Sequence, residues 1–130
     1  PSHITPTILG VPCVVMPRFD AEEALALIEK HKVSVLAAVS TQFIMMLEAP
    51  GARTRDLSSL RVLFTGGEAV PYARAAEFEE RTGACVLQFY GSNETGAVSG
   101  TSLEDSREAR LRTAGKPIPE MNHLRNGFSN

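Results

Sequence analysis

The feature that most constrains the fold of this chain is an alternation of short apolar runs with amphipathic helical patterns. Apolar runs rich in β-branched residues predict buried strands at 11–16, 33–39, 60–65 and 85–90. A helical pattern lies between each pair of successive runs. Strands and helices that alternate in this order indicate right-handed crossovers and a parallel sheet. The sequence therefore predicts an α/β fold, with a doubly wound, mostly parallel sheet and flanking helices.

Capping residues predict where these helices begin and end. Asp20, followed by Glu23, has the sequence form of a capping box. Ser40 is expected to cap the second helix through its hydroxyl. Pro71 suits the first position of the third helix, and Gly83 suits the left-handed position just past its end. Each helix is therefore expected to be short and to lead from one strand to the next.

The composition excludes several classes of protein. The 130 residues carry a net charge of −2, with 43% hydrophobic and 22% charged residues, as in an ordinary globular domain. A charge near zero argues against a nucleic-acid binder. No apolar run approaches the ~20 residues that a membrane-spanning helix requires. We therefore expect small-molecule ligands, no nucleic acid and no membrane span.

The cysteines and the N-terminus bear on the origin of the chain. Cys13 and Cys85 both fall in predicted strands, which indicates buried, free thiols and a reducing, cytoplasmic location. The chain begins with Pro1, without a basic segment followed by an apolar one, so no signal peptide is expected. A first residue other than Met suggests a piece of a longer protein.

Two glycine-containing loops, at 66–68 and 91–96, directly follow the third and fourth predicted strands. Because ligands bind beyond the carboxyl ends of parallel strands, both loops are expected at one site. In the second loop, Asn93 and Thr95 can donate hydrogen bonds to phosphate, and Glu94 is a carboxylate of the kind that holds Mg²⁺. Tyr90 offers an aromatic face on which a base can stack, and Gly91 allows a ligand to approach the backbone.

A plainer interpretation of both loops stays open. From composition alone, the simpler interpretation of the second loop is a polar turn with a solvated glutamate, and that of the first is a flexible connection between strand and helix. Neither loop has the G-x-G-x-x-G fingerprint of a dinucleotide site or the G-K-[ST] ending of a P-loop.

Four segments, taken together in their order and spacing, resemble one enzyme superfamily. They are residues 56–61 (DLSSLR), 66–71 (GGEAVP), 88–96 (QFYGSNETG) and 115–119 (GKPIP). Over residues 8–121 the chain is similar to the middle of the N-terminal domain of adenylate-forming (AMP-binding) enzymes, in particular the acyl-CoA synthetase or carboxylate–CoA ligase branch. The resemblance implies that residues 1–121 are a fragment of that domain and that residues 122–130 are a divergent tail.

The resemblance also implies a chemistry. These enzymes join a carboxylic acid to ATP in the presence of Mg²⁺ and pass the acyl group to CoA. By the resemblance, Asn93 and Glu94 are catalytic and Glu94 holds the metal, while Val39, Ser40 and Phe43 are candidates for the acid pocket. The adenine nucleotide is assigned to Gly66, Gly67, Glu68, Tyr90, Gly91, Ser92 and Asn93. Asn93 stands where the family usually has Thr, and Ser40 stands where Pro is common.

Several family elements do not occur in these 130 residues. They are the phosphate loop with its Lys, the Asp that binds the ribose, and the C-terminal domain with its catalytic Lys. The fragment is therefore expected to be inactive alone, and its uncovered sheet surface is expected to favour self-association. Two alternatives remain: a non-catalytic nucleotide-binding or interaction module derived from the family, and an unrelated doubly wound domain such as a response-regulator-like switch.

Overall fold

The computed structural model describes residues 4–92 and 94–119. In chain order the elements are α1 (Ile4–Leu9), α2 (Ala21–His31), β1 (Val35–Ala37), α3 (Ser40–Glu48), the 3-10 helix η1 (Pro50–Arg53), β2 (Val62–Gly66), α4 (Tyr72–Thr82), β3 (Cys85–Ser92), β4 (Gly96–Gly100), α5 (Arg107–Arg112) and β5 (Lys116–Pro117). The last three predicted strands and all three predicted helices are present, and no described helix is long and apolar enough to cross a membrane.

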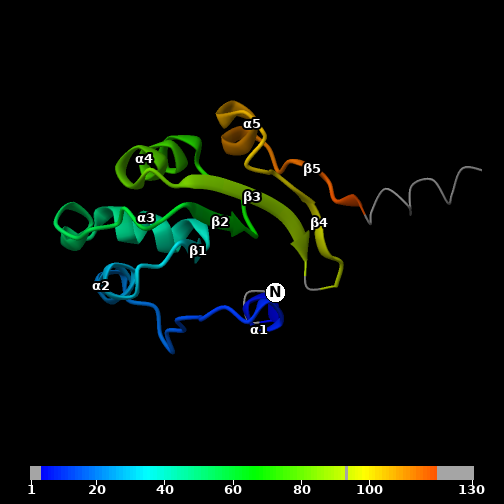
Figure 1. Cartoon of the computed structure of the whole chain (residues 1–130). Helices are drawn as coiled ribbons and strands as arrows, with labels where there is room; N and C mark the ends of the chain where they lie inside the picture. Colours follow the sequence, from blue (N-terminus) through cyan, green and yellow to red (C-terminus); the bar gives the residue numbers. More distant parts are fainter. Residues whose placement is uncertain (1–3, 93, 120–130) are drawn as a thin grey trace, which may run out of the picture.

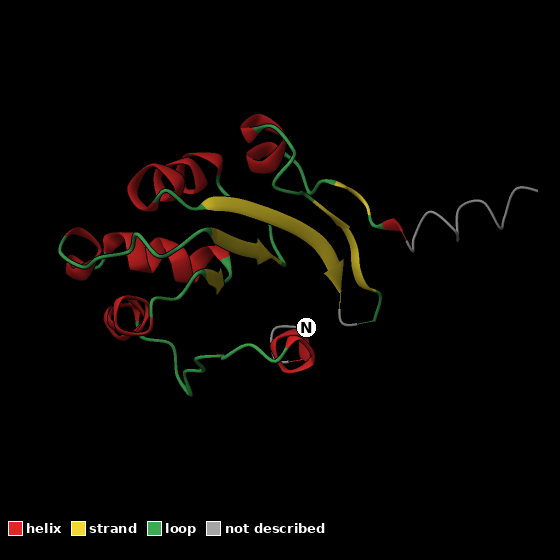
Figure 2. Ribbon diagram, viewed as in Figure 1, coloured by secondary structure: helices red, strands yellow, loops and turns green. Residues whose placement is uncertain are grey.

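The strands form one mixed sheet in the order β1-β2-β3-β4-β5 (Figure 1). β1, β2 and β3 are parallel, as the alternating pattern predicts. β3 runs on beyond this pairing and turns back into β4, and β4 and β5 are antiparallel (Figure 2). The α/β class, the parallel strands and the flanking helices are thus confirmed, with an antiparallel extension that the sequence pattern did not predict.

One face of the sheet carries the core. Leu63 of β2 and Val86 of β3 are paired neighbours and both are fully buried. Phe43 of α3 and Phe78 of α4 pack edge to face above them, with ring centroids 5.6 Å apart. Residues of α2, α3, α4 and α5 all belong to this same core. These helices lie on one face of the sheet. Right-handed crossovers between parallel strands that follow one another in the same direction across the sheet place their helices on the same side.

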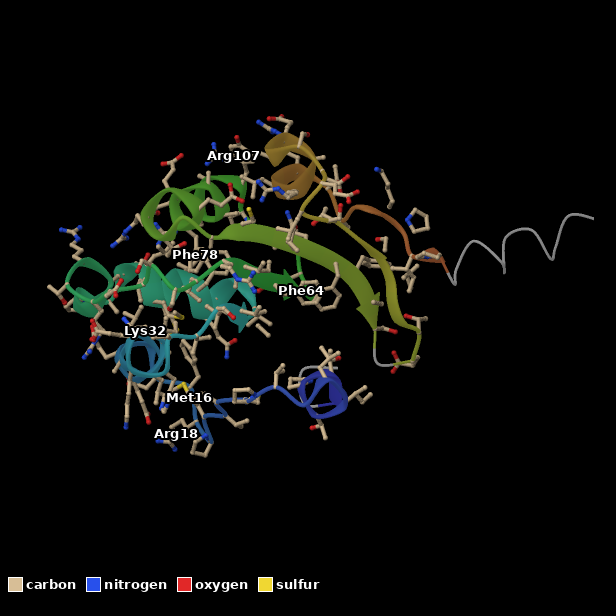
Figure 3. The ribbon with its side chains drawn as sticks, in the orientation of Figure 1. Met16, Arg18, Lys32, Phe64, Phe78 and Arg107 are labelled. Carbon is tan, nitrogen blue, oxygen red and sulfur yellow. The ribbon has the colours of Figure 1, made fainter. Side chains whose placement is uncertain are left out.

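The other face of the sheet is uncovered in the described part of the chain. Val35 is 53% exposed, and Phe64 is 38% exposed and stacks on Phe89 with ring centroids 4.8 Å apart. Phe64 can be located beside the sheet in Figure 3. Leu36 and Leu63, the chain neighbours of Val35 and Phe64, point to the core instead. This alternation is expected where only one face of the strands is packed.

Residues 11–16, predicted as a buried strand, form no strand. Val11, Val14 and Val15 are 51%, 42% and 63% exposed, and Cys13 is exposed rather than buried. The apolar composition is that of a strand, but no described strand pairs with this segment. Without a strand ladder to satisfy its backbone groups, the segment stays irregular and open to solvent.

Local capping explains the helix ends. The Asp20 carboxylate accepts a hydrogen bond from the backbone N–H of Glu23 at 2.9 Å, which confirms the predicted start of α2. Gly83 ends α4 with a φ of 76°, also as predicted. Ser40 does not cap α3: Val39 precedes the helix and donates its N–H to the Gln42 side chain at 3.1 Å. The Ser40 hydroxyl has another partner, described below.

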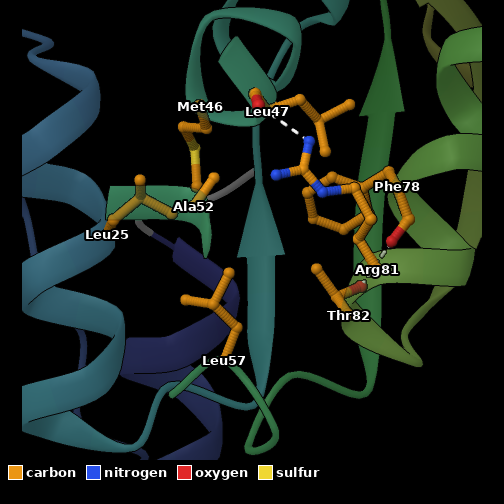
Figure 4. A pocket seen from close by; sticks show the side chains of 8 residues that line it. All are labelled: Leu25, Met46, Leu47, Ala52, Leu57, Phe78, Arg81 and Thr82. Carbon is orange, nitrogen blue, oxygen red and sulfur yellow. Dashed lines mark hydrogen bonds between the residues drawn. The ribbon is translucent and has the colours of Figure 1, made fainter. Parts of the chain in front are cut away.

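A small cavity of about 10 Å³ lies between α2, α3 and α4 (Figure 4). Its walls are mainly apolar, and Arg81 closes one side by donating a hydrogen bond to the Leu47 carbonyl at 2.8 Å. A space of this size holds about one water molecule. The cavity is therefore a packing defect of the core and not a ligand site.

Candidate functional site

The ends of β2 and β3 lie side by side, because Thr65 pairs with Gln88 and Gly66 with Phe89. This confirms the prediction that the two strands are parallel neighbours; of the second predicted loop, 91–96, only Gly91 lies in the groove wall beside the 67–70 segment. A groove of about 590 Å³ opens at this edge of the sheet. Its walls are residues 67–70 with Tyr72, residues 88–91, and residues 111–114. Of the residues assigned to the nucleotide, Gly67, Glu68, Tyr90 and Gly91 line it.

The first wall is the turn at 66–68, between β2 and α4. Gly66 is buried, and a Cβ there would lie 2.6 Å from the carbonyl oxygen of Phe89, so only glycine allows the two strand ends to approach this closely. Gly67 has a φ of 93°, a backbone conformation that other residues rarely adopt. Together the two glycines turn the chain sharply, and Glu68 emerges in the groove wall.

Ser40 and Glu68 contact each other across the fold. The Ser40 hydroxyl, 5% exposed at the start of α3, donates a hydrogen bond to Oε1 of the Glu68 carboxylate. The resemblance had placed Ser40 in the acid pocket and Glu68 in the nucleotide site, and the structure brings these two residues together. No short-range pattern reveals the contact, because the two residues are 28 positions apart.

The second wall follows β3. Tyr90 is 65% exposed and presents its ring at the groove, where a planar ligand could stack. Gly91 also lines the groove, and the pairing of the strands gives a separate reason for glycine there: a Cβ at this position would collide with the carbonyl oxygen of Gly96 in the paired strand. Glycine is thus required here by the irregular pairing of β3 with β4, where the register shifts between Tyr90 and Gly91.

The third wall comes from α5 and was missed in the sequence. Arg112 places its guanidinium over the Tyr72 ring, 4.3 Å from the centroid, and pairs with Glu108 one turn earlier. The charged segment before residue 113 gives no strand or loop signal that would place it near the glycine turns. Two local signals of a helix were present here: Arg112 four positions after Glu108, and Ser106, which caps α5 by accepting a hydrogen bond from the backbone N–H of Ala109.

Ser92, Glu94 and Thr95 lie at the tip of the β3–β4 hairpin and not in the groove wall. Ser92 Oγ accepts hydrogen bonds from the backbone N–H groups of Glu94 and Thr95, both at 3.2 Å, and Thr95 Oγ1 donates to the Gly96 carbonyl at 3.1 Å. These hydroxyls therefore hold the turn together. Asn93 lies outside the described residues.

The Glu94 carboxylate is exposed and ionised at neutral pH. A hydrogen bond from Ser92, and a smaller contribution from its own backbone N–H, lower its pKa from the usual 4.5. In the described part of the chain no cluster of three or more acidic, His or Cys side chains could hold a metal by itself. Mg²⁺ commonly takes only one or two carboxylates together with substrate phosphates, so a single glutamate is a sufficient protein donor.

The remaining candidates for the acid pocket lie in two environments. Val39 is 43% exposed and directly precedes the first residue of α3. Phe43 is fully buried against Phe78 in the core, and it is not part of the groove wall.

The sequence of the chain is similar to those of a known enzyme family. The family model for AMP-binding enzymes matches residues 2–123. The chain is 34% identical over 118 residues to a medium/long-chain-fatty-acid–CoA ligase, FadD8, of Mycobacterium tuberculosis, covering 89% of this chain and 21% of the relative. It is 32% identical over 126 residues to 2,3-dihydroxybenzoate-AMP ligase of Bacillus subtilis, covering 93% and 23%.

The fold of the chain is also similar to solved structures. An anthranilate CoA ligase in complex with anthranoyl-AMP superimposes with a TM-score of 0.80 at 27% identity, covering 89% of this chain and 22% of that structure. The chain thus spans about a fifth of the length of the curated relatives it matches.

Proposed function

Because the chain belongs to the AMP-binding enzyme family, we propose that it is part of an ATP-dependent carboxylate–CoA ligase and that its groove receives the adenine end of the nucleotide. The observation that carries the proposal is the meeting of the 66–68 turn with Tyr90 in one groove. A flat base can stack on an aromatic face, and the exposed Tyr90 beside the 66–68 turn supports this assignment.

The tip of the β3–β4 hairpin is proposed to bind the phosphates of ATP. Glu94 is an ionised carboxylate two residues beyond the end of β3, the strand that contains Tyr90 and Gly91. It would hold Mg²⁺ jointly with the phosphates of ATP. The metal supplies charge neutralisation as pyrophosphate leaves, and Asn93 is proposed to donate a hydrogen bond to the α-phosphate.

In the proposed reaction the carboxylate of an acid attacks the α-phosphorus of ATP and pyrophosphate departs. The thiol of CoA then replaces AMP on the acyl carbon. The relatives include fatty-acid, indoleacetate and 2,3-dihydroxybenzoate ligases, so both aliphatic and aromatic acids are candidate substrates. Val39 and Ser40, at the start of α3, are the proposed contacts on the acid side.

The two cysteines are free, in keeping with a reducing, cytoplasmic location.

A second candidate is a nucleotide-binding module without catalysis. The favouring observation is that the groove is formed while Glu94 lies outside its wall. The two candidates differ in acid-dependent exchange of pyrophosphate into ATP by a longer protein that contains this segment: a ligase catalyses the exchange and a binding module does not. We expect none from these 130 residues alone, because they contain no glycine-rich phosphate loop with a Lys. Exchange above background would show that the chain catalyses adenylation by itself.

Calorimetric titration with AMP tests the groove assignment. Tyr90→Ala should weaken AMP binding by about 5- to 150-fold, since base stacking on an aromatic residue contributes about 1–3 kcal/mol. Leu103→Ala is the matched control, because Leu103 is 61% exposed and lies outside the groove wall. A wild-type chain that does not bind AMP, or a Tyr90→Ala variant that binds it unchanged, would contradict the assignment.

A further inference from the structure

Gln88 of β3 is a buried polar residue that joins the sheet to α5. It is 9% exposed, and its Nε2 donates a hydrogen bond to the carbonyl oxygen of Arg110 at 2.8 Å. The backbone of Gln88 is fixed as well. Its N–H donates to Thr101 Oγ1 at 2.9 Å, and its carbonyl oxygen accepts from the Thr101 N–H at 2.9 Å. The side-chain amide therefore reaches α5 from a strand position that is itself held in place.

α5 depends on such a contact because it is short. It has six residues, whereas isolated helices shorter than ~12–15 residues are marginal in water. The last four carbonyl groups of a helix have no partner within it, and the Arg110 carbonyl is one of these. The side chains of Arg107 and Arg110 pair with Glu79 of α4. Those pairs hold side chains, whereas Gln88 holds the backbone of the last turn.

The last turn of α5 leads into the third wall of the groove, which begins directly after Arg110 and runs from residue 111 to residue 114. In this wall the Arg112 guanidinium lies over the ring of Tyr72, which also lines the groove. Among the described residues that line the groove, Arg112 carries the one positive charge, and its side chain is 56% exposed. A cation held on an aromatic face can meet an anionic ligand with little loss of freedom.

We propose that Gln88 is a positioning residue: by binding the Arg110 carbonyl, it holds the Arg112–Tyr72 pair in place as a nucleotide-binding wall. The inference rests on the proposed function, because it requires a nucleotide in the groove. Gln88 acts through the backbone of α5, and Arg112 acts through its guanidinium, so their effects on the ligand depend on each other. A role of Gln88 in stability alone would leave the two effects independent.

A double-mutant cycle on AMP affinity, measured by calorimetric titration, tests this dependence. Gln88→Met keeps the length of the side chain and removes the donor, so it should weaken AMP binding about three- to tenfold, the range for one lost hydrogen bond. Arg112→Ala should weaken it about two- to fivefold, as for one exposed cation–π contact. The double variant should bind AMP about as tightly as Gln88→Met alone, whereas the fold changes of independent residues multiply.

Ser59→Ala is the matched control for the loss of one hydrogen bond from a side chain to a carbonyl. The Ser59 hydroxyl donates to the Val33 carbonyl at 3.0 Å, and neither residue lines the groove. This variant should bind AMP like the wild type.

Each outcome decides a separate point. Unchanged AMP affinity in Gln88→Met or in Arg112→Ala, or fold changes that multiply in the double variant, would overturn the inference. If Gln88→Met does not fold by circular dichroism, Gln88→Asn replaces it, because its amide is one methylene too short to reach the Arg110 carbonyl. A wild type that does not bind AMP would contradict the proposed function itself, which is a different failure.

Discussion

Glu79 of α4 and Arg110 of α5 form an ion pair whose side chains are only 10% and 9% exposed. The same carboxylate accepts a hydrogen bond from the backbone N–H of Val86 in β3 at 2.9 Å, and another from Arg107 Nε at 2.9 Å. Arg107 can be seen on α5, facing α4, in Figure 3. One glutamate thus joins two helices and a strand, and it fixes the helix that supplies Arg112 to the groove.

Loss of this carboxylate should be costly. Glu79→Gln keeps the size of the side chain but leaves the Arg110 charge buried without a partner. We expect the free energy of unfolding to fall by about 3–5 kcal/mol, as when one member of a buried ion pair is removed. Urea denaturation measures the change. Glu80→Gln is the matched control: Glu80 pairs with Arg107 at the surface, where its side chain is 68% exposed, so a loss of about 1 kcal/mol or less is expected. Equal losses in both variants would contradict the assigned role.

Acid should destabilise the fold through the same group. Burial alone raises the pKa of Glu79, but the hydrogen bonds from Val86, Arg107 and Arg110 outweigh it and hold the pKa below the usual 4.5. A carboxyl whose folded pKa is lowered contributes stability above its unfolded pKa and loses that contribution as pH falls through the folded value. Stability should therefore decline below about pH 4.5, and decline less steeply in Glu79→Gln. Urea midpoints between pH 7 and pH 3 test this, and parallel profiles for the two proteins would disprove it.

The parallel half of the fold could be predicted because its signals are local. Three features determine the local structure within a few residues: Asp20 with Glu23, the apolar run before Gly66, and Gly83. The antiparallel half gave no such signal: β4 spans Gly96–Gly100, with a glycine at each end, and it exists because β3 supplies its hydrogen bonds. Strand propensity of this kind depends on the neighbouring strand more than on composition.

The candidate site divides in the same way. The meeting of the 66–68 turn with Tyr90 followed from the rule that parallel strands end at one edge. The Ser40–Glu68 contact and the Arg112–Tyr72 contact could not be predicted, because each joins distant parts of the chain through tertiary packing. The apolar run at 11–16 shows the converse error, since a strand-like composition forms a strand only where a partner strand is available.

The uncovered sheet face should make the isolated chain self-associate. Val35 and Phe64 are exposed apolar side chains on this face, and β1 is an edge strand with an open ladder. Phe64→Ser should lower the apparent mass in light scattering at high protein concentration and reduce binding of a dye specific for exposed apolar surface. Leu103→Ser, which removes a more exposed apolar residue from a loop, should leave both unchanged. A strictly monomeric wild type would contradict the prediction.

Glu94 should govern the effect of Mg²⁺ on ATP binding and leave AMP binding alone. Glu94→Gln keeps the size of the side chain and removes the charge that attracts the metal. In the wild type, Mg²⁺ should tighten ATP binding, because the ion bridges the carboxylate and the phosphates. In the variant this enhancement should fall by about tenfold, the effect of losing one charge-assisted contact.

AMP affinity distinguishes a metal-binding role of Glu94 from a general change in the hairpin. AMP affinity depends on stacking against Tyr90 and should be the same in both proteins, so a drop in AMP binding would point to a disturbed turn. Glu104→Gln controls for the loss of one surface charge. Because the pKa of Glu94 lies below its usual value, the Mg²⁺ effect should persist from pH 8 down to pH 5. Equal Mg²⁺ dependence in wild type and Glu94→Gln would identify Glu94 as a solvated turn residue.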